Sequence, residues 1–183
     1  MESKKPPFMP LSLWLYVPGL VFFIYLFFAV FSYSAENSNN LIVSGLHLID
    51  FGVHEVSHIV VAFLPPLAVA AAGSIGEIGF TFLILYATLK AKSYFATVFA
   101  ALWVMLGFMS VGRYMADARA QVLPLMGPGD APQHDWNFIF SQLGWLNADT
   151  IIGGTVSAIG VIIGACGLLL GSYLIILKVI RRA

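Results

Sequence analysis

The chain has 183 residues, of which 60% are hydrophobic and 10% charged, and its nine basic and nine acidic residues give a formal net charge of zero. A soluble domain of this size carries far more surface charge, so the composition indicates the lipid bilayer as the main solvent. The neutral balance gives no basis for nucleic-acid binding, and we expect no nucleic-acid partner. The sequence predicts an all-α, polytopic membrane helical bundle that forms one integral membrane domain over residues 1–183.

Four apolar segments reach the roughly 20 residues that cross a hydrocarbon core of about 30 Å. They are Leu11–Tyr33, Leu67–Leu89, Tyr94–Ala116 and Thr150–Ile180. The first is too long for the core of a signal peptide, so we interpret it as a retained span. The last is rich in glycine, including Gly160 and Gly164, and small residues let helix backbones approach closely. We expect this last helix to pack inside the bundle or against a partner chain.

A fifth apolar segment, Leu41–Leu64, contains ionisable residues and ends at Pro65-Pro66. Its ionisable side chains are His47, Asp50, His54, Glu55 and His58. Because proline lacks an N–H and clashes with the preceding turn, the helix cannot continue through this pair. The segment could cross the membrane completely or enter it and return.

The basic residues favour the second possibility. Seven of the nine form three clusters, namely Lys4-Lys5, Lys90 with Lys92, and Lys178 with Arg181-Arg182. All three lie on one side of the membrane only if the fifth segment returns, as the positive-inside tendency prefers. We therefore predict four full spans plus one re-entrant or half-buried helix, with five spans as the alternative. Both termini would then be cytoplasmic.

The long polar connection at residues 118–149 would lie on the opposite, periplasmic side. Connections of this length in small membrane proteins are often functional or dock as a cap. It contains Gly127-Pro128-Gly129 and His134-Asp135. Tyr114, just before this connection, and Trp136, within it, are interpreted as interfacial anchors.

The strongest chemical signal is His54-Glu55-Val56-Ser57-His58. Histidines four residues apart share one helix face, so both imidazoles can reach one Zn²⁺ at about 2.0–2.1 Å. Glu55 would lie beside the metal and could act as the general base toward a bound water. Asp50, one turn before His54, could orient its second nitrogen. The alternative is structural, with the histidines hydrogen bonded to carboxylates that hold the helix in place.

A catalytic zinc normally has three protein ligands and one open position, so a third ligand must come from elsewhere in the chain. We place Asp117 first and His134 second. Asp135 and Glu77 are further candidates. The plain alternatives are an ion pair of Asp117 with a nearby arginine and simple surface polarity for His134 and Asp135.

These motifs resemble those of a group of uncharacterised bacterial multi-pass membrane proteins. The resemblance rests on His54-Glu55-x-x-His58, Ala116-Asp117-Ala118-Arg119-Ala120-Gln121 and His134-Asp135-Trp136, and covers about residues 50–162. It implies a bacterial inner-membrane location and joins Asp117 and His134-Asp135 to the histidine pair in one site.

More distantly, the chain is similar to the site-2-type intramembrane metalloproteases. That similarity implies zinc on His54 and His58, Glu55 as the base and Asp117 as the carboxylate ligand. The family aspartate usually stands in Asn-Pro-Asp-Gly or Leu-Asp-Gly, whereas Asp117 stands in Ala-Asp-Ala.

Two functions remain open from the sequence. The first is a membrane-embedded zinc metallohydrolase or peptidase that acts on a membrane-bound peptide. The second is a non-catalytic accessory subunit of a larger membrane complex, with a structural metal or only a polar cluster. A transporter ranks below both, because no pair of matching broken helices is visible.

Overall fold

The computed structural model describes residues 13–33, 40–125 and 133–180. Within these residues the chain forms α-helices, one short 3-10 helix and no strand, so the all-α prediction is confirmed. The elements are α1 (Leu13–Phe31), α2 (Leu41–Val60), α3 (Pro66–Lys90), α4 (Tyr94–Ala116), α5 (Asp135–Leu143), η1 (Leu146–Ala148) and α6 (Asp149–Ile180).

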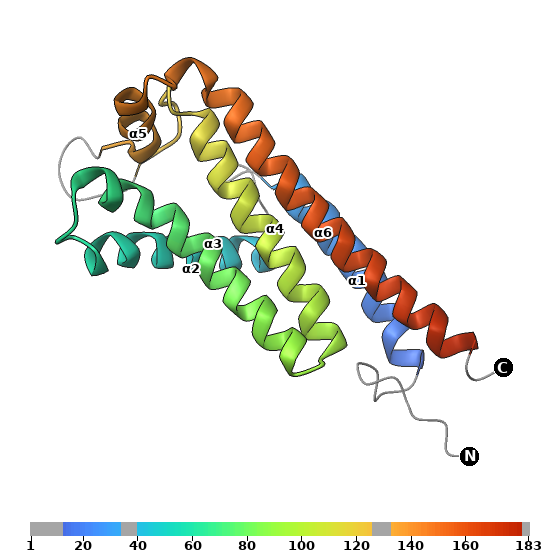
Figure 1. The fold of residues 1–183 in the computed structure, drawn as a ribbon. Helices are drawn as coiled ribbons and strands as arrows, with labels where there is room; N and C mark the ends of the chain where they lie inside the picture. Colours follow the sequence, from blue (N-terminus) through green and yellow to red (C-terminus); the bar gives the residue numbers. More distant parts are fainter. Residues whose placement is uncertain (1–12, 34–39, 126–132, 181–183) are drawn as a thin grey trace.

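Helices α1, α3, α4 and α6 are long and apolar enough to cross a membrane, which confirms the prediction of four spans. Figure 1 shows that the start of α1, the α3–α4 turn and the end of α6 lie at one end of the bundle, and α5 lies at the other. Lys90, Lys92 and Lys178 therefore share one end. The rest of the three basic clusters lies outside the described residues, and the cytoplasmic location of this end stays a prediction.

Helix α2 is not among the candidate spans and runs obliquely across α3 and α4 (Figure 1). Asp50 and His54 are buried against the bundle, whereas Leu48, Val56 and Ile59 are exposed. This polar-inside, apolar-outside arrangement suits a helix that meets lipid on its outer face. It agrees with the predicted half-buried helix.

Helix α4 lies at the centre of the bundle and contacts all five other α-helices. Its most extensive contact is with α6, whose buried glycines face it. At Gly112 and Gly153 the two backbones approach so closely that a Cβ atom on either glycine would overlap the carbonyl oxygen of the other. The last helix was predicted to pack inside the bundle or against a partner chain, and its glycine face packs on α4 within the bundle.

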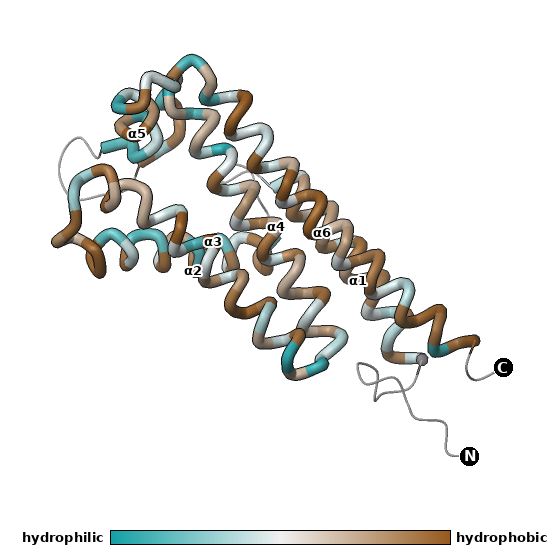
Figure 2. The backbone as a smooth tube through the Cα atoms, viewed as in Figure 1, coloured by the Kyte–Doolittle hydropathy of each residue, from teal (hydrophilic) through white to brown (hydrophobic). Residues whose placement is uncertain are grey.

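The connection predicted as a polar loop contains helix α5 and the 3-10 helix η1, and α6 already begins at Asp149. His134 caps α5, because its side chain accepts the N–H of Asn137, and Gly144 ends the helix in the left-handed conformation with φ 70°. Ile139 and Phe140 are buried in a core cluster with residues of α3 and α4. Hydropathy varies along α5, as expected for a short helix docked on an apolar bundle (Figure 2). Gly127-Pro128-Gly129 lies outside the described residues.

The adjacent residues Gly153 and Gly154 offer a matched test of the α4–α6 contact. A Cβ at Gly153 would lie 2.6 Å from the Ala116 nitrogen, whereas a Cβ at Gly154 meets nothing within 4 Å. Both alanine variants gain the same helix propensity. We therefore expect Gly153→Ala to have a free energy of unfolding about 1–3 kcal/mol lower than Gly154→Ala, from overpacking. Denaturant titration of both variants in detergent measures this difference, and equal stabilities would contradict the close approach.

Candidate metal centre

Two glycines of α3 let α2 lie close enough to bring its histidines into the bundle. A Cβ at Gly73 would overlap the imidazole of His54, and a Cβ at Gly76 would overlap the Ser57 side chain. The spacing of the two glycines equals that of His54 and Ser57, so one face of α3 fits one face of α2. The hydroxyl of Ser57 donates to Val53 O at 2.7 Å, within its own helix, so this hydrogen bond needs no acceptor on α3.

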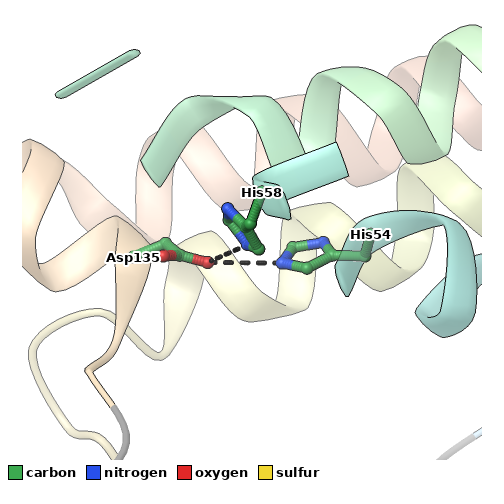
Figure 3. Close-up of side chains that lie close together, drawn as sticks. All are labelled: His54, His58 and Asp135. Atoms are coloured by element: carbon green, nitrogen blue, oxygen red, sulfur yellow. Dashed lines mark hydrogen bonds and ion pairs between the residues drawn. The ribbon is translucent and has the colours of Figure 1, made fainter. Parts of the chain in front are cut away.

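His54, His58 and Asp135 form a group that could hold a metal ion. One ligand atom from each residue lies within 4.8 Å of the other two. The Asp135 Oδ2 atom is 3.2 Å from His54 Nε2 and 3.3 Å from His58 Nε2. Figure 3 shows both rings directed at the same carboxylate oxygen. The histidines come from α2 and the aspartate from the first turn of α5, so the group joins two distant parts of the chain.

The Nδ1 atom of each histidine ring, on the side away from Asp135, already has a hydrogen-bond partner. A backbone carbonyl oxygen only accepts hydrogen bonds, so His58 Nδ1, 2.8 Å from Val69 O, carries the ring proton. His54 Nδ1 lies 3.3 Å from Glu77 Oε2 and donates to that carboxylate when it is ionised. In neutral rings both Nε2 atoms then present lone pairs to Asp135 Oδ2, which is itself an acceptor. Three electron-pair donors converge on one point, and a cation there would satisfy all three.

Asp135 is held in place by the docking of α5. Its backbone N–H donates to the Tyr114 hydroxyl at 2.9 Å. The Trp136 indole donates to Ser74 Oγ at 3.0 Å, and the Asn137 amide donates to Ala118 O at 2.7 Å. Polar contacts to α3, to α4 and to the residues after α4 therefore fix the helix that carries the third ligand.

The structure does not bring Asp117 or His134 to the histidine pair. Both oxygens of Asp117 accept backbone N–H groups, those of Val122 and Leu123, at 3.0 Å each. His134 Nε2 lies 3.5 Å from Asp117 Oδ2, and burial lowers the pKa of this imidazole despite the opposing effect of the carboxylate. The sequence favoured Asp117 and then His134 as the third ligand, whereas the geometry offers Asp135.

Glu55 follows His54 directly in α2 and is half-buried. Within the described part of the chain, no hydrogen bond or ion pair holds its carboxylate. A carboxylate without such a partner, next in sequence to a histidine of this group, is a candidate for a general base.

Glu77, not Asp50, supports His54. Asp50 is fully buried and accepts the Trp103 indole N–H at 2.8 Å, so its contact is with α4. Glu77 is 4% exposed and is the carboxylate that pairs with His54 Nδ1. The sequence contained one indication of this role: Glu77 is a charged residue in an otherwise apolar segment, three residues after Ser74. Such a residue inside a membrane helix needs a partner.

Comparisons with protein-family models, with curated proteins and with solved structures each returned no match.

The roles of Glu77 and Asp50 can be separated by two isosteric substitutions. Removing the carboxylate charge that orients a metal-bound histidine typically weakens metal affinity about 10–100-fold. We expect Glu77→Gln to lose zinc affinity to that extent. Asp50→Asn changes a carboxyl group on the face of α2 that carries His54 but removes no contact to His54, so we expect it to bind zinc within a few-fold of wild type. Zinc titration of both purified variants tests this, and the reverse ranking would restore the assignment made from the sequence.

Proposed function

We propose that this protein is a membrane-embedded zinc hydrolase whose metal ligands are His54, His58 and Asp135 and whose general base is Glu55. The observation that carries this proposal is the convergence of two imidazole Nε2 atoms and one carboxylate oxygen on a single point. Two histidines with one carboxylate are a common ligand set of catalytic zinc, which keeps a fourth position open. The resemblance to site-2-type intramembrane metalloproteases supports the same chemistry.

The residues around the centre divide the catalytic work. Zinc bound there would polarise a carbonyl group and lower the pKa of a bound water to about 7. Glu55 accepts a proton from that water as the water oxygen attacks the carbonyl carbon. Glu55 then returns the proton to the nitrogen of the leaving amine, so the carboxylate ends each cycle unchanged. Glu77 and the Val69 carbonyl keep the ring protons on the Nδ1 atoms of the two histidines.

The proposed substrate is a peptide bond in a membrane-bound polypeptide. Four candidate spans and the outward apolar face of α2 put this protein in contact with lipid. The His58 and Asp135 side chains are 20% and 17% exposed, so two members of the group are partly accessible from outside the bundle. A polypeptide in the same membrane is the substrate class with direct access to such a centre.

The same contacts support a second, non-catalytic function. With an additional proton on each ring, His54 would bridge Glu77 and Asp135, and His58 would bridge Val69 O and Asp135. These bridges link α2, α3 and α5 without a metal ion. In that case the cluster fixes the bundle of an accessory subunit, and metal content separates the two functions.

Metal content tests the ligand assignment. We expect about one zinc per chain in the wild type, and its loss in the His54→Ala, His58→Ala double variant and in Asp135→Asn, because each loses ligands. Asp117→Asn loses one of the two backbone N–H contacts, because an amide nitrogen cannot accept a hydrogen bond, but it removes no atom of the His54–His58–Asp135 group and should retain zinc. Elemental analysis of protein purified without chelator measures this. A metal-free wild type would support the accessory function, and zinc lost from Asp117→Asn but retained in Asp135→Asn would restore the ligand predicted from the sequence.

Glu55→Gln tests catalysis separately from binding. Loss of a general base typically lowers the rate about 10²–10⁴-fold, whereas the three ligands remain. We therefore expect normal zinc content together with a rate reduced by that factor. Proteoliposomes that contain quenched-fluorescent peptides with an apolar segment provide the assay. A Glu55→Gln protein that cleaves these peptides at the wild-type rate would exclude Glu55 as the base.

A further inference from the structure

We propose that the Tyr114 hydroxyl forms an oxyanion-binding site with the open metal position, and that this site takes the carbonyl-derived oxygen of the substrate. The inference rests on the proposed function. The ligand class is an oxygen anion attached to a carbonyl-type carbon, as in a tetrahedral adduct, a carboxylate or a hydroxamate.

The first argument is the position of the hydroxyl. Tyr114 Oη lies 3.4 Å from Asp135 Oδ2, the same oxygen that both histidine Nε2 atoms approach at 3.2 Å and 3.3 Å. The hydroxyl therefore borders the point where the three ligand atoms converge. An oxygen that enters the fourth position from this side comes within reach of Tyr114.

The second argument is the direction of the hydroxyl proton. Tyr114 Oη accepts the Asp135 backbone N–H at 2.9 Å, which occupies a lone pair and leaves the O–H proton free to donate. Its nearest acceptor, Asp135 Oδ2 at 3.4 Å, lies beyond the usual length of an O–H···O hydrogen bond. Binding of Oδ2 to a cation would weaken that acceptor further. An oxyanion in the fourth position is then the better acceptor for this proton.

The third argument is that the ring is held rigidly. Tyr114 stacks on His134, with ring centroids 4.2 Å apart and an interplanar angle of 28°, and the His54 ring lies 6.0 Å away. A donor that is fixed before the reaction stabilises developing charge without reorganisation, and loss of one such donor typically lowers the rate about 10²–10³-fold.

A purely structural role for Tyr114 makes a different prediction. If the hydroxyl only anchors the N–H of Asp135, its removal would displace the third ligand and reduce zinc affinity. Binding of an oxyanion ligand to the metal that remains would not change. A structural role of the hydroxyl would therefore change zinc binding, whereas the proposed role would change oxyanion binding.

The experiment uses the full-length protein in detergent, loaded with zinc and titrated with acetohydroxamate by calorimetry. Hydrogen bonds to charged groups contribute about 1.5–3 kcal/mol, so we expect Tyr114→Phe to bind acetohydroxamate about 10–100-fold more weakly. Zinc content should stay at the wild-type level. Tyr173→Phe, a change of the same chemistry at an exposed position of α6, should leave both values unchanged.

Unchanged hydroxamate affinity in zinc-loaded Tyr114→Phe would overturn this inference and leave the proposed function intact. Loss of zinc from the variant, with normal hydroxamate affinity of the loaded fraction, would also overturn it and assign Tyr114 to positioning. A wild type that binds zinc but no hydroxamate would instead overturn the open position and, with it, the proposed function.

A second replacement keeps the test independent of folding. With 3-fluorotyrosine at position 114, the ring and hydroxyl remain and the hydroxyl becomes a stronger donor. Hydroxamate should then bind more tightly than to the wild type, and an equal or weaker affinity would overturn the proposal.

Discussion

Acidic and imidazole side chains can lie inside an apolar bundle only when each is hydrogen bonded or neutralised, and the arrangement of α2, α3 and α5 follows from this constraint. Glu77 meets His54, both histidines meet Asp135, and His58 meets the Val69 carbonyl. In this set of contacts, the oxygens of Glu77, Asp135 and Val69 outnumber the N–H protons that two neutral imidazoles carry. An additional proton on each ring, or a cation between the two Nε2 atoms and Asp135 Oδ2, would satisfy these acceptors.

Close helix packing makes the constraint possible to satisfy. Gly73 and Gly76 leave the space that His54 and Ser57 occupy, and Gly112 and Gly153 bring α4 against α6. A residue with a side chain at Gly73 would force the imidazole away from Glu77 and Asp135. The absence of side chains at these glycines thus sets the distance between the helices. The meeting of His54 with Glu77 and Asp135 therefore depends on residues that have no functional groups.

The sequence predicts those parts of the molecule that depend on local pattern. Helix length and hydropathy identified the four spans, and the spacing of His54 and His58 placed both on one face before any tertiary contact was known. The sequence named Asp135 as a candidate but did not rank it above Asp117, because Asp135 reaches the histidines only when α5 docks through Trp136, Asn137 and the hydroxyl of Tyr114. The register between α2 and α3 likewise decides that Glu77 rather than Asp50 meets His54.

The location of the centre also limits what can react there. In a membrane span every backbone carbonyl is hydrogen bonded within its own helix, so water cannot attack a carbonyl until that helix is locally unwound. Asp135 of the His54–His58–Asp135 group belongs to the first turn of α5, and α5 lies at the end of the bundle opposite the α3–α4 turn (Figure 1). The C-terminal ends of membrane helices already have unpaired carbonyls. For the proposed hydrolase, this favours a peptide bond at or near the C-terminal end of a substrate helix over one at mid-membrane, where unwinding would leave several polar groups in lipid.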